Sequence, residues 1–210
     1  MKQFDSIGFD LDGTLWDSAG AVAPGWNQAL EEMGLPNRVT ADDIHGIMGL
    51  NIYDIAEKFF PDMEKDRAIA VIRRCCQLEN DFILKNGGIL YPDLEYTLQQ
   101  LSKKYKLYIV SNCEEGYIEA FLGYHKEIKP YISDFTCPGY TGGLSKGKNI
   151  RILLERNHWE NSIYVGDTLG DQKAAQEAGI PFVHACYGFG QAEHPDYSIK
   201  TIRQLLKIFE

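Results

Sequence analysis

Short apolar segments alternate with longer amphipathic ones over most of the chain. Five segments are short and rich in β-branched and aromatic residues, as strands are: Ile7–Phe9, Leu107–Val110, Asp134–Cys137, Ser162–Val165 and Pro181–Cys186. Helical periodicity lies between most of them, at Leu94–Lys104, Gly116–Leu122, Gly147–Asn157 and Gly170–Ala178. Strands that alternate with helices predict βαβ units, and therefore an α/β fold built on a parallel sheet.

The alternation breaks once, after the first predicted strand. Most of Ala19–Lys85 has helical periodicity, and Thr40 with Asp43 three residues later forms a capping-box pattern. The glycines and the proline of Lys85–Asp93 predict a hinge where the chain returns. We therefore predict a Rossmann-like parallel sheet core, residues 1–16 and 88–210, with an inserted all-helical domain, residues 17–87.

Polar residues suited to binding and catalysis follow the predicted strands. The segments are DLDGT after the first strand, VSN at the end of the second, SKGKN before the helix that follows the third, and VGDTLGD after the fourth. Because the carboxyl ends of parallel strands meet at one edge of a sheet, these segments are expected to converge on a single crevice. The candidate residues are Asp10, Asp12, Gly13, Thr14, Ser111, Asn112, Lys146, Lys148, Asp167 and Asp171.

The charges in this crevice do not balance. Asp10 and Asp12 are two residues apart, and two carboxylates at ~4 Å repel by about 4 kcal/mol at an effective dielectric of ~20. With Asp167 and Asp171 there are three or four acids against one or two lysines. Hard oxygen ligands of this kind suit Mg²⁺, which binds through one or two carboxylates together with phosphate oxygens and water. A lysine and a Ser-Asn pair would complete a cradle for a phosphate dianion.

The ordered motifs carry a family resemblance. DLDGTL at 10–15, VSN at 110–112, Lys146 before a helix and GDTLGD at 166–171 resemble the four motifs of the haloacid dehalogenase-like (HAD) hydrolase superfamily. The likeness covers nearly the whole chain, and the helical insert resembles the cap of phosphoglycolate-phosphatase-like members. Dehalogenases of the superfamily lack an acid at the position of Asp12, so its presence here argues against that branch.

The resemblance implies a phosphatase that works through a covalent intermediate. Asp10 would attack phosphorus and form an aspartyl-phosphate. Asp12 would protonate the leaving alcohol and then activate water, with a pKa that neighbouring carboxylates raise. Lys146 would neutralise the phosphoryl group and orient Asp10. Lys148 is the alternative for that role, because no proline-rich stretch follows Lys146 as it often does in the family.

The resemblance also implies the ligands of magnesium and of the phosphoryl group. Asp10, the backbone carbonyl of Asp12 and Asp167 would bind Mg²⁺, and Asp171 would be an outer or alternative contact. Ser111 would donate a hydrogen bond to the phosphoryl group, and Asn112, Gly13 and Thr14 would complete substrate binding. We assign no role to the glycine-rich segment 187–190. Of the residues near the motifs, Asp17 is expected to be a capping or hinge residue, and Trp16 either lines the entrance of the cap or packs at the hinge.

Two other activities stay open at this stage. A phosphomutase of the β-phosphoglucomutase kind would use the same motifs, and a phosphate-binding regulator without catalysis would keep the fold. The motifs do not identify the substrate, a small phosphorylated metabolite for which phosphoglycolate is one candidate. Asp93 stands where related enzymes often have Gly, so it is expected either to affect the choice of leaving group or to cap the following helix.

Composition narrows the setting of the protein. The formal net charge is -9 and the isoelectric point is near 5.1, which argue against nucleic acid as a partner. No apolar run approaches a membrane span, and the N-terminus lacks the apolar stretch of a signal peptide. The five cysteines are an odd number without CxxC spacing, which favours a reduced, cytoplasmic protein. We expect a monomer or a homodimer, and the histidines are scattered without the spacing of metal ligands.

Overall fold

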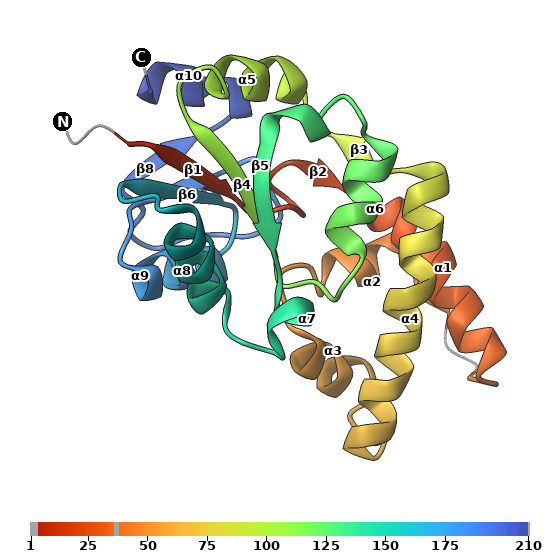
Figure 1. The fold of residues 1–210 in the computed structure, drawn as a ribbon. Helices are drawn as coiled ribbons and strands as arrows, with labels where there is room; N and C mark the ends of the chain where they lie inside the picture. The colour runs from red at the N-terminus through yellow and green to blue at the C-terminus, as the bar shows by residue number, and fades with distance from the viewer. Residues whose placement is uncertain (1–3, 36–37, 210) are drawn as a thin grey trace.

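A parallel sheet of six strands forms the centre of the molecule (Figure 1). The computed structural model describes residues 4–35 and 38–209. Across the sheet the strand order is β5-β4-β1-β6-β7-β8, and each neighbouring pair is parallel. The strands are β1 (Ser6–Phe9), β4 (Lys106–Val110), β5 (Ile132–Thr136), β6 (Ser162–Gly166), β7 (Phe182–Ala185) and β8 (Tyr197–Ile199). The predicted α/β fold with a Rossmann-like parallel sheet core is confirmed.

Helices cover both faces of this sheet. Helices α8 and α9 pack together on one face, and α5 and α10 lie on the other (Figure 1). Alternate residues of β4 serve the two faces: Leu107 and Ile109 belong to one apolar cluster, and Tyr108 and Val110 belong to the other. A strand buried on both faces is a continuous apolar run, which is why the sequence revealed it. The core helices are α5 (Leu94–Leu101), α6 (Tyr117–Tyr124), α7 (Pro138–Thr141), α8 (Lys146–Asn157), α9 (Leu169–Ala178) and α10 (Leu205–Ile208), with two 3₁₀ turns, η1 (Lys129–Tyr131) and η2 (Ile202–Gln204).

The inserted segment is helical, as predicted. Its helices are α1 (Ala19–Glu32), α2 (Ala41–His45), α3 (Ile52–Phe59) and α4 (Lys65–Asn86). Helices α1 and α4 pack along each other, and α4 also packs against α6 of the core (Figure 1). Thr40 and Asp43 form the predicted capping box at the start of α2. The insert is therefore a cap anchored on the core by its longest helix.

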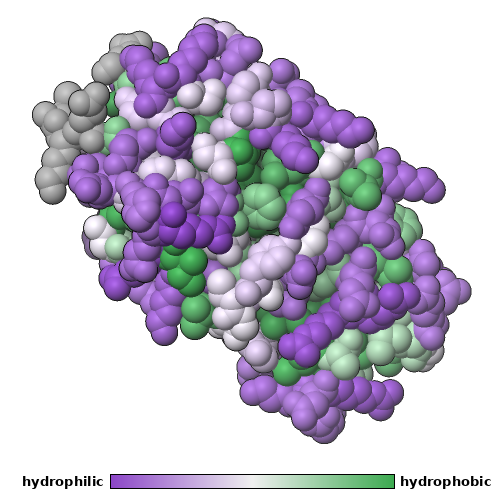
Figure 2. Space-filling model, viewed as in Figure 1, coloured by the Kyte–Doolittle hydropathy of each residue, from purple (hydrophilic) through white to green (hydrophobic). Residues whose placement is uncertain are grey.

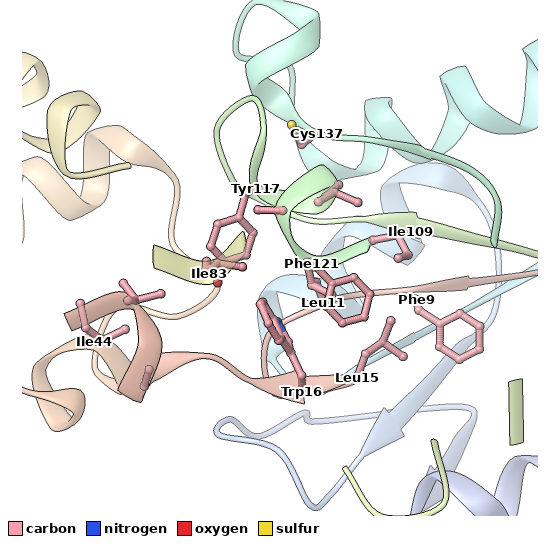
Figure 3. Packing of buried hydrophobic residues seen from close by; sticks show 14 of the residues in the cluster. Phe9, Leu11, Leu15, Trp16, Ile44, Ile83, Ile109, Tyr117, Phe121 and Cys137 are labelled. Atoms are coloured by element: carbon pink, nitrogen blue, oxygen red, sulfur yellow. The ribbon is translucent and has the colours of Figure 1, made fainter. Parts of the chain in front are cut away.

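A small two-stranded sheet joins the cap to the core. Strand β2 (Trp16–Asp17) pairs antiparallel with β3 (Ile89–Leu90), so the chain leaves and re-enters the core at one place. The Trp16 ring is fully buried there and meets the edges of Phe121 and Tyr117, as Figure 3 shows. Of its two expected roles, the structure supports packing at the hinge. Asp17 accepts a hydrogen bond from the Ala19 amide at the start of α1, in keeping with its expected capping role.

Some elements differ from the sequence expectation. Strand β5 begins two residues earlier than predicted, at Ile132, and ends at Thr136. Lys146 is the first residue of α8 and does not lie ahead of the helix, because the hydroxyl of Ser145 caps it. The short strands β2, β3 and β8 and the helix α7 were not predicted. These elements are two to four residues long, too short for a periodicity to show.

The visible surface is mostly hydrophilic, as expected for a chain with a large net charge. Figure 2 shows mostly hydrophilic residues on the face in view, with hydrophobic residues in separate small areas. Among the described helices, none combines the length and the apolar character that crossing a membrane would require.

Replacing Asp93 by glycine should stabilise the fold. Asp93 has a left-handed backbone (φ 63°), and its side chain does not cap α5. A non-glycine residue in this region costs about 1 kcal/mol, so Asp93→Gly should raise the free energy of unfolding in urea by about 0.5–1 kcal/mol. Asp93→Ala is the control and should not stabilise. If both variants stabilised equally, loss of the acidic side chain, and not relief of backbone strain, would be the cause.

Candidate active site

Lys146 joins two buried carboxylates from different parts of the chain. Its ammonium group donates to Asp10 Oδ1 at 2.7 Å and to Asp171 Oδ1 at 2.6 Å. Asp10 directly follows β1, Lys146 begins α8 and Asp171 lies in the first turn of α9, and all three side chains are buried. Lys148, two residues further along α8, is exposed. The structure thus brings Lys146, and not Lys148, to the predicted crevice.

Burial and the neighbouring charges shift the pKa values of the residues in this cluster. The pKa of Asp10 is raised well above its usual range, chiefly by burial and next by the charge of Asp171, and Lys146 opposes both. The pKa of Lys146 is raised by its two carboxylate partners, although burial alone would lower it. One ammonium group therefore holds two acids without neutralising the whole site.

Asp167 completes the acidic cluster. Its Oδ2 accepts hydrogen bonds from the backbone amides of Phe189 (2.7 Å) and Gly190 (3.2 Å), and the Thr14 hydroxyl donates to its Oδ1 at 3.4 Å. Burial and the charge of Asp171 raise the pKa of Asp167 to about 6. Gly13 lies so close that an added Cβ would stand 2.4 Å from Asp167 Oδ2, and its φ is +81°. The substrate contacts predicted for Gly13 and Thr14 stay predictions. In the structure both residues lie against Asp167 and help to hold its side chain in place.

Asp12 belongs to a different network. Its Oδ1 accepts hydrogen bonds from the hydroxyls of Ser18 (2.7 Å) and Tyr117 (2.8 Å), which are also 2.7 Å from each other. Burial raises the pKa of Asp12, and these two hydrogen bonds oppose the rise. The raised pKa was expected, but the expected cause, neighbouring carboxylates, was wrong, because burial of the side chain raises it.

A partly open cavity lies between the cap and these residues. It has a volume of about 70 Å³, and Asp10, Asp12, Ser111 and Asn112 are among the core residues that line it. The Asn112 amide donates to the backbone carbonyl of Gly49 at 2.8 Å, which holds a cap loop over the site. Ser111 is buried beside Asp10 at the end of β4. Ser111 and Asn112 of the VSN motif thus face the cavity, as their place in the sequence predicted.

The cap contributes one buried acid to the same cavity. Glu79 of α4 is 6% exposed and accepts a hydrogen bond from the indole nitrogen of Trp26. Burial raises the pKa of Glu79 from 4.5 to about 8. The residue was missed in the sequence, although a signal exists: Glu79 lies three and seven residues from Cys76 and Ile72 on the apolar side of α4.

Other residues of the site gave no sequence signal. Tyr117 and Ser18 become partners of Asp12 only through tertiary packing, and the amides of Phe189 and Gly190 act through the backbone. His45 of the cap lies 3.0 Å from Asp17 at the hinge, a contact that its position in the sequence did not indicate.

The acidic cluster has the donor set of a hard divalent cation. Asp10, Asp167 and Asp171 each offer a carboxylate oxygen, and these oxygens lie within 4.8 Å of one another. Three buried carboxylates beside one ammonium group leave excess negative charge, which Mg²⁺ would neutralise. The Asp171 Oδ2 accepts from the amide and the hydroxyl of Thr168 and its Oδ1 accepts from Lys146, so both oxygens of this carboxylate already have partners. The Asp12 side chain lies outside the cluster, which leaves its backbone carbonyl for the predicted metal contact.

Comparison with known families agrees with this geometry. The family model described as haloacid dehalogenase-like hydrolase matches residues 7–185, which include the cap and every motif named above. The chain belongs to the haloacid dehalogenase-like hydrolase family. The predicted membership of the HAD superfamily is confirmed.

Several relatives of this HAD-like chain are phosphatases by name. A phosphoglycolate phosphatase of Aquifex aeolicus is 31% identical over 211 residues, which cover 96% of this chain and 95% of the relative. A phosphoglycolate phosphatase of Photorhabdus laumondii is 28% identical, with 98% and 92% covered. These relatives and the family show that the chain is a phosphatase, similar to phosphoglycolate phosphatases, and imply a small phosphorylated substrate.

Solved structures of HAD-like proteins share the whole fold. A haloacid dehalogenase-like hydrolase from Streptococcus pneumoniae superposes with a TM-score of 0.81 at 26% identity, and both chains are covered completely. A protein described as a predicted phosphoglycolate phosphatase from Haemophilus somnus gives 0.80 at 25% identity, again over 100% of both chains. The core and the cap of this HAD-like chain therefore both have counterparts in known structures.

Removing the Lys146 charge should destabilise the protein strongly. Lys146→Met leaves Asp10 and Asp171 buried without their cation, so the free energy of unfolding at pH 7 in EDTA should fall by about 3 kcal/mol. The loss should shrink as the pH is lowered, because burial raises the pKa of Asp10 and this carboxylate then takes up a proton. Lys148→Met removes an exposed charge of the same helix and should change stability by less than about 0.5 kcal/mol. Equal effects of the two variants in urea unfolding would contradict the buried cluster.

Glu79→Gln should change how stability depends on pH. The folded state keeps the proton of Glu79 up to about pH 8, whereas the unfolded state loses it near 4.5. Stability should therefore fall as pH rises between these values, and by linkage the wild type should lose about 3 kcal/mol relative to Glu79→Gln between pH 5 and 8. Urea unfolding of both proteins across this range measures the difference. Parallel pH curves would show that Glu79 ionises in the folded state as it does in water.

Proposed function

We propose that the protein is a magnesium-dependent phosphatase that hydrolyses a small phosphate monoester through an aspartyl-phosphate on Asp10. The observation that carries the proposal is the separation of two buried carboxylates. Asp10 is bound by Lys146, and Asp12, two residues on, is bound by Ser18 and Tyr117. Both carboxylates line the cavity between the cap and the core, so a bound ester would meet a nucleophile and a proton donor together.

The first step forms the covalent intermediate. A carboxylate oxygen of Asp10 attacks phosphorus while the bond from phosphorus to the leaving oxygen breaks. Asp12 gives its proton to that oxygen, and the alcohol leaves. Its raised pKa keeps Asp12 protonated at a higher pH than a carboxyl in water, which suits it as the acid. Lys146 keeps Asp10 in place and offers positive charge to the phosphoryl group.

The second step releases phosphate. Water attacks the phosphorus of the aspartyl-phosphate, and Asp12, now ionised, takes its proton. The bond between Asp10 and phosphorus breaks, which restores the Asp10 carboxylate and the protonated Asp12. The Ser18 and Tyr117 hydroxyls support the ionised form of Asp12 by donating to it, so the same residue serves in both steps.

Magnesium fits as the cofactor of this site. Asp10 and Asp167 would hold it, with Asp171 and the Asp12 carbonyl as further predicted contacts. When bound, the cation would screen the negative charge that Asp10 and the phosphoryl group bring together. Ser111, at the cavity wall, would donate a hydrogen bond to the phosphoryl group. Asn112, the next residue along the chain, would help to position the same group.

The proposal also includes the domain bounds, the cellular location and the partners that the sequence predicted. The helical cap is residues 17–87 and the core is residues 1–16 and 88–210, with the β2–β3 pair at the boundary. A cytoplasmic location agrees with the free thiols of all five cysteines. A partner of nucleic acid or membrane is not expected, and a monomer or a homodimer is. A phosphomutase of the β-phosphoglucomutase kind stays the alternative activity.

Two substitutions should separate the chemical steps. Asp10→Asn should abolish release of both alcohol and phosphate, because the nucleophile is lost. Asp12→Asn should release about one equivalent of nitrophenol from nitrophenyl phosphate and then stall, since this leaving group needs little protonation whereas the water attack needs a base. Rapid-mixing measurement of nitrophenol, with mass spectrometry of the phosphorylated chain, follows both events.

Metal removal provides the matching control. EDTA should abolish turnover of the wild type, and added Mg²⁺ should restore it.

A variant of an exposed acid is the control for the two substitutions: Asp54→Asn, in α3, should behave as the wild type. Full turnover by Asp10→Asn would refute the covalent mechanism.

A further inference from the structure

The glycine-rich segment 187–190 lies directly over Asp167. An added Cβ at Gly188 would stand 2.3 Å from the Asp167 Cβ and 2.5 Å from its Oδ2, so only glycine allows the chain to pass this close. From there the amides of Phe189 and Gly190 donate to Asp167 Oδ2 at 2.7 and 3.2 Å. The segment therefore fixes one oxygen of this carboxylate through its backbone.

The core holds the first half of this segment. The Tyr187 hydroxyl donates to the backbone carbonyl of Thr14 at 2.9 Å, and the Tyr187 ring meets the Tyr91 ring with centroids 4.8 Å apart. The Gly188 amide donates to the backbone carbonyl of Ala185, at the end of β7, at 3.1 Å. Residues of the core therefore set where the segment begins.

The cap contacts the second half. The half-buried Phe189 ring packs against the ring of His45, the last residue of α2, with centroids 4.8 Å apart. His45 Nε2 in turn lies 3.0 Å from Asp17 Oδ1, at the hinge between core and cap. A continuous row of contacts thus runs from the hinge through the cap and Phe189 to Asp167.

This row ends on a carboxylate of the candidate magnesium site. Asp167 offers an oxygen to the acidic cluster with Asp10 and Asp171, and the amides on its Oδ2 determine how the whole carboxylate is turned. Removing the hydrogen-bond partners behind a metal ligand typically lowers metal affinity by about 10–100-fold. Loss of the Phe189 ring would keep its amide but free the residue that carries it, so part of this effect is expected.

We propose that Phe189 is a positioning residue that couples the cap to the metal site. Its contact with His45 holds the amides of segment 187–190 on Asp167 and so raises the affinity of the site for Mg²⁺. The inference rests on the proposed magnesium-dependent function and adds a part of the cap to the control of the cofactor. Because coupling between two sites is reciprocal, bound Mg²⁺ also stabilises the cap in the position where His45 meets Phe189.

Calorimetric titration with Mg²⁺, in the absence of substrate, tests the proposal. Phe189→Ala and His45→Ala should each lower the affinity for Mg²⁺ by at least about threefold. The double variant should lose about as much as the more affected single variant, because both substitutions remove the same contact. Phe189→Tyr keeps an aromatic ring and should bind Mg²⁺ as the wild type does. His194→Ala, which removes an exposed histidine of the core, is the control and should also bind as the wild type.

Two further readouts separate positioning from a general loss of structure. In Phe189→Ala the Mg²⁺ concentration for half-maximal turnover should rise by the factor that calorimetry gives, and most of the lost turnover should return at saturating Mg²⁺. Hydrogen exchange measures the reciprocal effect. Mg²⁺ should slow the exchange of the α2 amides in the wild type and do so much less in Phe189→Ala.

The outcomes distinguish this inference from the function on which it rests. Wild-type affinity for Mg²⁺ in both Phe189→Ala and His45→Ala would overturn the coupling and leave the proposed phosphatase intact. A loss in Phe189→Ala with none in His45→Ala would overturn the role of the cap. If Phe189→Ala did not fold, His45→Ala alone would decide the question. If the wild type bound no Mg²⁺, the proposed cofactor would be wrong, and the inference with it.

Discussion

The buried contact of Lys146 with Asp10 and Asp171 is the interaction on which the site depends. Burying three ions is costly unless each finds a partner, and these partners come from the end of β1 and the starts of α8 and α9. The strand order places β1 beside β6, whose carboxyl end leads into α9, and α8 packs against α9. The topology of the sheet thus assembles the charges, and the Ser145 cap begins α8 at Lys146.

The two acids of the DLD segment differ because the chain separates their surroundings. After β1 the backbone turns at Gly13, and Asp10 and Asp12 enter different networks, one ionic and one of hydroxyl groups. Neither acid appears among the causes of the other's pKa shift, and burial leads both shifts. The repulsion between Asp10 and Asp12 that the sequence suggested is therefore reduced mainly because the two side chains have different partners. What still requires a cation is the closeness of Asp10 to Asp167 and Asp171.

The sequence predicted the parts of the site that follow buried strands. Asp10, Ser111 and Asp167 come directly after apolar runs, and parallel strands bring such ends together regardless of the loops between them. The edge strand β8 could not be predicted, since two of its three residues are exposed and the alternation is lost. Tyr117 and Glu79 were missed for a different reason. Each becomes functional only where the cap meets the core, and a helix pattern does not say what its buried side will face.

The cap has to supply selectivity, because the core chemistry depends little on the leaving group beyond its proton. Asp10, Lys146 and Ser111 address the phosphoryl group, which every monoester shares. The cap residues that line the cavity also belong to the packing surface between α1 and α4, the most extensive helix contact among the described residues. Burying Glu79 in that surface lowers the free energy of unfolding at pH values above the pKa that the residue has in the unfolded state. It also places a polar atom in a largely apolar cavity. Glu79 is thus a polar group through which the cap can contact what enters the cavity.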